Sequence, residues 1–331
     1  MTMMIYIYVA AGLAFLCVGG EVLVRAAVAL AGRLNVSPVL IGLTIVAFGT
    51  SAPELTVAIT AALEGQSGIT LGSVVGSNIS NIFLVLGVTA LIQTLHPARG
   101  LVMRDGLFML AVTVGFALVC LTGVITATQG TLFLVLLASY VIFSYWAERR
   151  RASKKNGTEE SAQSVDEVKG LSQSYVVTLP LLAAGIASVV VGADLLVEGA
   201  VAIAIQFGVS DAVIGLSLVA VGTSLPELAV SIMAAWRGRG DVAIGNILGS
   251  NIVNILGIIG ITSLIVDVEV PAQIASYDIW VMLLASLVLL PVLLTGKRMV
   301  RSEGLVFVGF YGLYITSLFT GLPSFFMSLA G

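Results

Sequence analysis

The sequence predicts an all-α membrane protein with ten transmembrane helices, arranged as two inverted five-helix repeats in which helices 2 and 7 are broken. Three observations support this fold class: the composition, the spacing of the apolar segments and an internal repeat. Of the 331 residues, 58% are hydrophobic and 10% are charged, and the mean hydropathy is +1.10. Soluble domains carry about 25% charged residues. The chain is therefore expected to cross a lipid bilayer many times.

Ten apolar segments are long enough for a membrane crossing, which takes about 20 residues. In chain order they cover approximately residues 4–31, 37–63, 69–95, 102–123, 130–147, 174–205, 210–236, 242–266, 273–295 and 304–328. Residues 1–147 and 174–331 hold five segments each, and the hydrophilic stretch 148–173 between them is predicted to be a linker. Because five is odd, the second set must enter the membrane from the opposite side, so the repeats are inverted.

The basic residues indicate the orientation of these segments. With the linker in the cytoplasm, fourteen of the fifteen Lys and Arg residues fall on the inner side, and Arg25 alone lies within an apolar segment. Cytoplasmic loops of membrane proteins are enriched in Lys and Arg. We therefore predict a multi-pass protein of the cell membrane with its N-terminus outside and its linker in the cytoplasm.

Two motifs occur twice, each time 173 residues apart. The first reads GLTIVAFGTSAPEL at 42–55 and GLSLVAVGTSLPEL at 215–228. The second reads GSNISN at 76–81 and GSNIVN at 249–254. Each copy places a carboxylate, hydroxyls and amides inside segments that are otherwise apolar. Ionisable side chains at such depth indicate a functional site.

The first motif supplies both a helix break and a charge. Pro53 and Pro226 have no N–H, so the carbonyl four residues earlier loses its helical donor. Such backbone is tolerated at membrane depth where it lines a cavity or binds something. Carboxylate, hydroxyl, amide and carbonyl oxygens suit Ca2+ or Na+, and suit Zn2+ or Cu2+ poorly. Glu54 and Glu227 would meet at the repeat interface and together carry two negative charges. One Ca2+ or two Na+ would neutralise these charges.

A chain with ten segments, in which GTSxPE is followed twice by GSNxxN, resembles the cation/Ca2+ exchanger superfamily and, within it, the prokaryotic-type Na+/Ca2+ exchanger branch. The signature parts are residues 42–87 and 215–260. The resemblance implies an antiporter, not an enzyme, that exchanges three Na+ for one Ca2+ by alternating access. We predict Ca2+ and Na+ as substrates in a lipid bilayer, with no cofactor, nucleic acid or protein partner. The implied ligands are Glu54, Glu227, Thr50, Thr223, Ser51, Ser224, Ser77, Ser250, Asn81, Asn254 and the backbone carbonyls of Ala47 and Ala220.

Several alternatives stay open. K+-dependent exchangers resemble this pattern but carry an Asp at the position of Asn254, which disfavours an additional K+ site here. H+- or K+-coupled exchange nevertheless remains an alternative within the superfamily. Outside it, an intramembrane hydrolase could use paired carboxylates, but no Ser/His or Cys/His arrangement accompanies them. A passive cation channel commonly needs a continuous pore built by several subunits.

Other polar residues of the segments have structural explanations. Glu21 and Arg25 are one helical turn apart and are expected to form an ion pair. Asp105 and Asp278 are 173 residues apart and are expected to cap the starts of segments 4 and 9. Buried amides often hydrogen-bond between helices, and this role is expected for Asn78 and Asn251.

Overall fold

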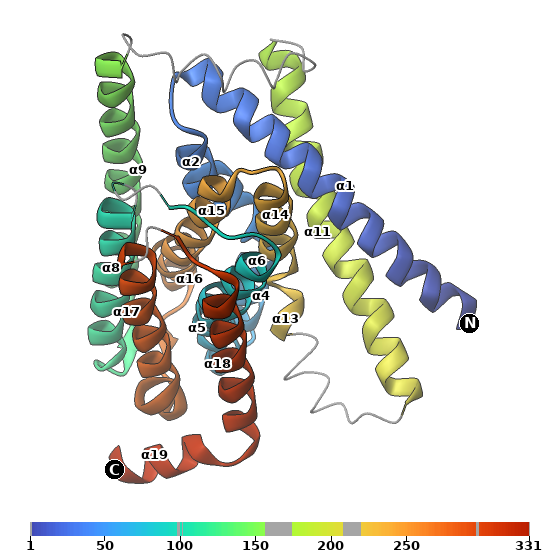
Figure 1. Ribbon diagram of the computed structural model, residues 1–331. Helices are drawn as coiled ribbons and strands as arrows, with labels where there is room; N and C mark the ends of the chain where they lie inside the picture. The colour runs from blue at the N-terminus through green and yellow to red at the C-terminus, as the bar shows by residue number, and fades with distance from the viewer. Residues whose placement is uncertain are drawn as a thin grey trace.

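The computed structural model describes residues 2–97, 100, 102–155, 174–207, 220–295 and 298–330, and these are helical nearly throughout (Figure 1). Within these described residues, eight helical stretches are long and apolar enough to span a membrane, and a bent pair of helices makes a ninth span. Of the predicted seventh segment, 210–236, the structure describes the part from Ala220 onward. Residues 208–219 lie outside the described part of the chain.

The first half follows the predicted order of five spans. In the labels below, η denotes a π-helical turn. The elements are α1 (Thr2–Leu34), α2 (Pro38–Ile41), η1 (Gly42–Val46), α3 (Ala47–Thr50), α4 (Ala52–Leu63), α5 (Ser67–Ser80), η2 (Asn81–Val85), α6 (Leu86–Ile92), η3 (Val102–Gly106), α8 (Leu107–Cys120) and α9 (Ala127–Lys155). Helix α9 therefore continues into the stretch 148–173 that the sequence predicts as linker.

The second half repeats this order. Its elements are α11 (Tyr175–Gln206), α13 (Ala220–Gly222), α14 (Leu225–Trp236), α15 (Gly240–Ile252), η5 (Val253–Ile259), α16 (Gly260–Ile265), η6 (Ile274–Asp278), α17 (Ile279–Thr295), α18 (Arg301–Phe319) and α19 (Leu322–Ala330). The predicted tenth segment, 304–328, is interrupted at Gly321, which has a φ of 74°. Glycine adopts this left-handed conformation without steric cost, so the chain turns there and α19 runs separately.

Contacts between repeat-equivalent residues reveal a pseudo-two-fold axis. Asn78 Nδ2 donates to the carbonyl of Asn251 at 3.4 Å, and the hydroxyls of Thr113 and Ser286 lie 3.5 Å apart; each pair is separated by 173 residues. Equivalent residues can touch only close to a symmetry axis. The axis therefore passes between α5 and α15 and between α8 and α17. Helices α1 and α11 pack side by side in opposite directions (Figure 1), and the predicted inverted-repeat fold is confirmed.

Glycines allow α15 to lie directly against the first half. A Cβ added at Gly249 would sit 2.4 Å from the carbonyl oxygen of Leu43, and one at Gly245 would sit 2.9 Å from that of Val39. No larger residue fits without moving the backbone. The span Gly240–Ile265 is accordingly buried along its apolar window, and it forms the centre of the bundle.

Short backbone pairings join the two halves at the ends of the bundle. Strand β1 (Val124–Ile125) pairs antiparallel with β2 (Val268–Glu269), so that Val124 lies opposite Glu269. A second link is an isolated bridge, in which the Leu95 N–H donates to Met299 O at 3.0 Å and the Met299 N–H donates to Leu95 O at 2.8 Å.

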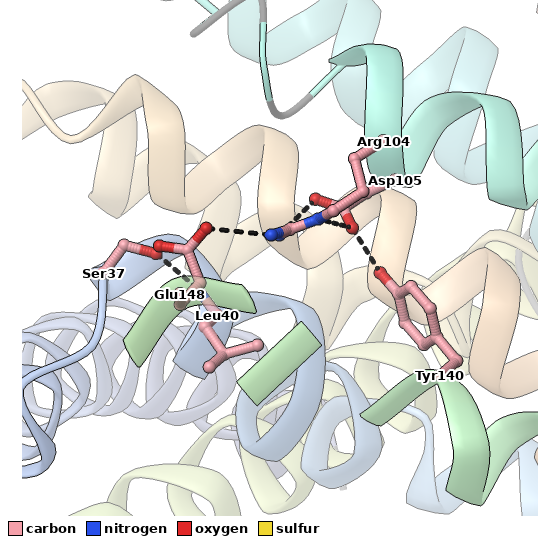
Figure 2. Close-up of polar contacts among 6 residues, drawn as sticks. All are labelled: Ser37, Leu40, Arg104, Asp105, Tyr140 and Glu148. Carbon is pink, nitrogen blue, oxygen red and sulfur yellow. Dashed lines mark hydrogen bonds and ion pairs between the residues drawn. The ribbon is translucent and has the colours of Figure 1, made fainter. Parts of the chain in front are cut away.

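The prediction that Asp105 and Asp278 cap helix starts is wrong. A capping side chain must precede the first helical turn, but Asp105 is the fourth residue of η3 and Asp278 is the last residue of η6. Asp105 is fully buried and accepts hydrogen bonds from Arg104 Nε at 2.8 Å and from the Tyr140 hydroxyl at 3.0 Å. Arg104 also donates to Glu148 at 2.9 Å (Figure 2). The cluster thus ties η3 to α9.

Asp278 has a different set of partners at the equivalent place in the second half. It accepts from Gln273 Nε2 at 3.1 Å and from the Tyr314 hydroxyl at 3.1 Å. Among the described residues no arginine or lysine is paired with it. Both aspartates therefore connect transmembrane elements through tyrosine hydroxyls, which sequence spacing alone did not indicate.

The predicted ion pair between Glu21 and Arg25 is confirmed and includes a third residue. The Glu21 carboxylate accepts from Arg25 and also from Arg237, whose Nε lies 2.7 Å from Glu21 Oε2. Arg237 follows α14, so this ion-pair cluster joins α1 to the end of the helix that carries Glu227.

Candidate cation-binding site

The two motif prolines start new helices inside the bundle. In the second span, α3 ends at Thr50 and α4 begins at Ala52, and the helices on either side of Ser51 are bent by 43°. Pro53 occupies the first turn of α4, where its missing N–H leaves no helical bond unmade. In the seventh span, Ser224 precedes α14, with Pro226 in its first turn. The predicted breaks of helices 2 and 7 are therefore found at equivalent positions.

Each break places a glutamate in the first turn of the new helix. Glu54 lies in the first turn of α4 and Glu227 in the first turn of α14, and both are fully buried. The positive end of a helix dipole stabilises a carboxylate at this position. Burial of an ionised carboxylate still costs several kcal/mol unless it is paired, and within the described residues neither glutamate forms an ion pair.

Serine hydroxyls from the second motif contact both carboxylates in the same way. Ser77 Oγ donates to Glu54 Oε1 at 3.4 Å, and Ser250 Oγ donates to Glu227 Oε1 at 3.4 Å. A further bond crosses between the repeats, because Ser51 Oγ donates to Glu227 Oε1 at 3.1 Å. The two halves thus contribute to one site.

Several other polar atoms at this site have no hydrogen-bond partner among the residues that the structure describes. They are Glu54 Oε2, Glu227 Oε2, Ser224 Oγ, Asn254 Oδ1 and both polar atoms of the Asn81 amide. Buried polar atoms are nearly always paired, so this group, in which every atom except the Asn81 nitrogen is an oxygen, needs an explanation. A hard cation satisfies such oxygens, because Ca2+ takes six to eight oxygen ligands.

The remaining predicted ligands have less direct roles in this conformation. The Ala47 carbonyl accepts from the Ser51 N–H at 3.0 Å and from the Thr50 hydroxyl at 3.3 Å, so two donors already occupy it. Thr223 is half-buried between α13 and α14, and Ala220 is the first residue of α13. Ala47, Thr50, Thr223 and Ala220 therefore stay predicted ligands.

Two asparagines were not predicted as part of the site but lie at its edge. Asn246 Nδ2 donates to Ser231 Oγ at 3.2 Å and to the Glu227 carbonyl at 3.5 Å. Asn78 Oδ1 accepts from Asn254 Nδ2 at 3.1 Å. Asn246 lies in an apolar segment one helical turn before Ser250. This spacing could have predicted that its amide lies on the same helix face as Ser250, at the edge of the site.

The oxygens gathered at this site are poor ligands for transition metals. In the part of the chain that the structure describes, no three His, Cys, Asp or Glu side chains gather as a metal site. Transition metals prefer thiolate and imidazole ligands. The cluster of two carboxylates with hydroxyl and amide oxygens instead fits Na+ or Ca2+.

Known proteins resemble this chain through both of its halves. Residues 4–146 and 177–320 match the family described as sodium/calcium exchanger protein. The chain is similar to the putative antiporter CaxA of Alkalimonas amylolytica, at 39% identity over 94% of this chain and 98% of that protein. It is also similar to the sodium/calcium exchanger MaX1 of Methanosarcina acetivorans, at 34% identity over 93% of this chain and 96% of that protein.

A solved structure of the sodium-calcium exchanger NCX_Mj superposes with a TM-score of 0.81 and 33% identity, covering 96% of this chain and 100% of that chain. The match extends through both halves, and the family is one of transporters rather than enzymes. These similarities support Ca2+ exchange by antiport as the activity of this multi-pass membrane protein. The chain belongs to the sodium/calcium exchanger family.

Proposed function

We propose that the protein is a secondary antiporter that exchanges three Na+ for one Ca2+ by alternating access. One observation carries the exchange of Na+ for Ca2+ at a shared site: Glu54 and Glu227 begin equivalent helices in the two halves, and Ser51 of the first half bonds to the carboxylate of the second at 3.1 Å. The number of three Na+ is what the similarity to Na+/Ca2+ exchangers implies. A single buried site with two carboxylates cannot hold its full complement of Ca2+ and Na+ at the same time, because the added charge would be uncompensated. Exclusion of one ion by the other is the basis of exchange.

We assign the ligands within this proposal as follows. Glu54 and Glu227 bind both kinds of ion, and the Ser51 oxygen lies beside them. The hydroxyls of Ser77 and Ser250, which contact the carboxylates, complete flanking Na+ positions. The amides of Asn81 and Asn254 close the centre of the site. Thr50, Thr223, Ser224 and the carbonyls of Ala47 and Ala220 supply further oxygens. Two donors are hydrogen-bonded to the Ala47 carbonyl in this conformation. The carbonyl can therefore bind an ion only if the end of α3 shifts slightly and releases one of these donors.

The transport cycle follows from the two breaks. Broken helices at mid-membrane, related by inverted repeats, favour alternating access around a fixed site. In the proposed orientation the N-terminus lies outside and the stretch 148–173 lies in the cytoplasm between repeat domains 1–147 and 174–331. No protein partner is needed for a site that one chain completes.

A second candidate is H+-coupled exchange. Its supporting observation is that Glu54 Oε2 and Glu227 Oε2 have no hydrogen-bond partner among the described residues, so either oxygen could carry a proton in place of Na+. In this case a proton gradient alone would drive Ca2+ uptake.

The two candidates are separated by flux into vesicles. Purified protein is reconstituted into liposomes, and 45Ca2+ uptake is measured with an outward gradient of Na+, of K+ or of H+ imposed separately. Na+-driven exchange predicts uptake with the Na+ gradient alone. Uptake driven by H+ alone would favour the second candidate, and uptake without any gradient of these ions would indicate a channel.

A further inference from the structure

The amide of Asn78 is held in one orientation at the two-fold axis. Its Nδ2 donates to the carbonyl of Asn251 at 3.4 Å and to Met282 Sδ at 3.6 Å. These acceptors fix the nitrogen end of the amide, so the oxygen end faces the other way. Asn78 Oδ1 accordingly accepts from Asn254 Nδ2 at 3.1 Å. The side chain is buried, at 1% exposure, so water does not compete for these bonds.

This contact determines how Asn254 faces the cation site. An amide has a donor end and an acceptor end, and the donor end of Asn254, Nδ2, is hydrogen-bonded to Asn78 Oδ1. Its Oδ1 therefore points away from Asn78, and it is buried without a hydrogen-bond partner among the described residues. Asn254 lies four residues beyond Ser250, which contacts the Glu227 carboxylate. An oxygen in this place attracts a cation, whereas the amide nitrogen would repel it.

We propose that Asn78 is a positioning residue for the cation site: it holds the Asn254 amide so that its oxygen, and not its nitrogen, faces the bound ion. The inference rests on the proposed function, because it takes the occupant to be Ca2+ or Na+. Asn78 itself touches no ion in this account. Its effect on binding acts through Asn254 alone.

The repeat provides a matched control at the equivalent residue. Asn251 Nδ2 donates to Met109 Sδ at 3.6 Å, which mirrors the bond from Asn78 to Met282. However, Asn251 Oδ1 and both polar atoms of Asn81 lack hydrogen-bond partners in the described part of the chain. Asn251 therefore does not orient Asn81 as Asn78 orients Asn254. The two positions have similar burial. They differ in this contact and in the bond from Asn78 Nδ2 to the Asn251 carbonyl, which Asn251 does not mirror among the described residues.

The test measures equilibrium Ca2+ binding by purified protein in detergent, at fixed pH and without Na+ or K+. Asn78→Leu keeps the branching of the side chain and removes the acceptor for Asn254, so we expect the Kd for Ca2+ to rise about tenfold or more. Asn251→Leu removes an amide that is similarly buried, and we expect the Kd for Ca2+ to change by less than about threefold. Equal losses in the two variants would show that Asn78 acts only through packing, and an unchanged Kd in Asn78→Leu would also overturn the inference.

A double substitution tests the orientation step itself. Both oxygens of a carboxylate accept, so in an Asn254→Asp background the orientation of residue 254 no longer matters. Asn78→Leu should then change the Kd less than about threefold relative to Asn254→Asp alone. A loss as large as in the native background would contradict the proposal.

A third variant covers the case in which Asn78→Leu does not fold. Asn78→Asp keeps an acceptor for Asn254 Nδ2 and loses the donor to the Asn251 carbonyl, so the Kd for Ca2+ should rise less than about threefold. A rise of about tenfold or more in Asn78→Asp would overturn the inference. A native protein that binds no Ca2+ would instead contradict the proposed function, which separates the two failures.

Discussion

Ser51 and Glu227 are 176 residues apart in the chain, and the serine hydroxyl donates to the glutamate carboxylate at 3.1 Å in the buried centre of the bundle. Ser51 stands at the break between α3 and α4, whereas Glu227 begins the equivalent helix of the other repeat. The carboxylate of the second half is therefore hydrogen-bonded by a residue at the helix break of the first half. Neither repeat alone can therefore form the site.

The first prediction compares Ser51→Ala with Ser224→Ala. Loss of a hydrogen bond to a charged group costs about 1.5–3 kcal/mol, so Ser51→Ala should lower the free energy of unfolding by this amount in ion-free buffer. Ser224 Oγ has no hydrogen-bond partner among the described residues. Ser224→Ala should therefore lower the free energy of unfolding less than Ser51→Ala does. Denaturant titration in detergent measures both. Equal destabilisation would show that the Ser51 contact is not maintained in solution.

The second prediction concerns close packing. A Cβ at position 249 would lie 2.4 Å from the Leu43 carbonyl oxygen, whereas a Cβ at Gly32 meets nothing within 4 Å. Gly249→Ala should therefore destabilise the protein by about 1–3 kcal/mol, the usual cost of overpacking. Gly32→Ala is the control and should be neutral or stabilise by up to about 1 kcal/mol. The measurement is thermal unfolding in detergent, and a stable Gly249→Ala protein would contradict the packing of α15 on η1.

The third prediction concerns selectivity at Asn254. Every proposed side-chain ligand of the second half matches its counterpart in the first, so the two halves are equally charged. Asn254→Asp adds a negative charge near the bound ions, and at an effective dielectric of about 20 this charge interacts by several kcal/mol. The variant should bind an additional monovalent cation or a proton, so that its Na+-driven Ca2+ flux becomes sensitive to K+ or to pH. The native protein should be insensitive to K+, and a native flux that requires K+ would show that Asn254 does not determine this selectivity.

The fourth prediction tests the orientation. A cysteine introduced at Ser161, within the predicted linker, should react with an impermeant thiol reagent only from the cytoplasmic side. Cys17 and Cys120 are replaced first, because they are the native cysteines of the sequence. Reaction from outside in intact cells would reverse the assignment of every loop.

The sequence was sufficient for the fold class and for the positions of the two breaks. Both depend on local chemistry: a membrane crossing needs a minimum length of apolar chain, and a proline removes the N–H of one helical hydrogen bond. The spacing of 173 residues between motif copies also predicted that Glu54 and Glu227 occupy equivalent positions. The hydrogen bond from Ser51 to Glu227, which joins the two halves at this site, is a contact between distant parts of the chain and was not predicted.

The features that sequence reading missed are tertiary. The π-helical turns at η3 and η6 place Asp105 and Asp278 within a helix rather than before it, and such turns are rare in proteins. Arg237 reaches Glu21 only because α1 crosses the end of α14. The orientation of an amide such as that of Asn254 depends on the neighbour to which it is bonded, and Asn78 is recognisable as that neighbour only once α5 and α15 are packed together.

The most direct test of the shared site is the Na+-driven uptake of 45Ca2+ by liposomes that contain the native protein, Glu54→Gln or Glu227→Gln. Glutamine keeps the shape of the side chain and removes its charge, so both variants should remain folded, as judged by size-exclusion chromatography, and both should show uptake no higher than protein-free liposomes. The native protein should show uptake that depends on the outward Na+ gradient. Robust Na+-driven uptake by either variant would contradict a site in which the two carboxylates act together.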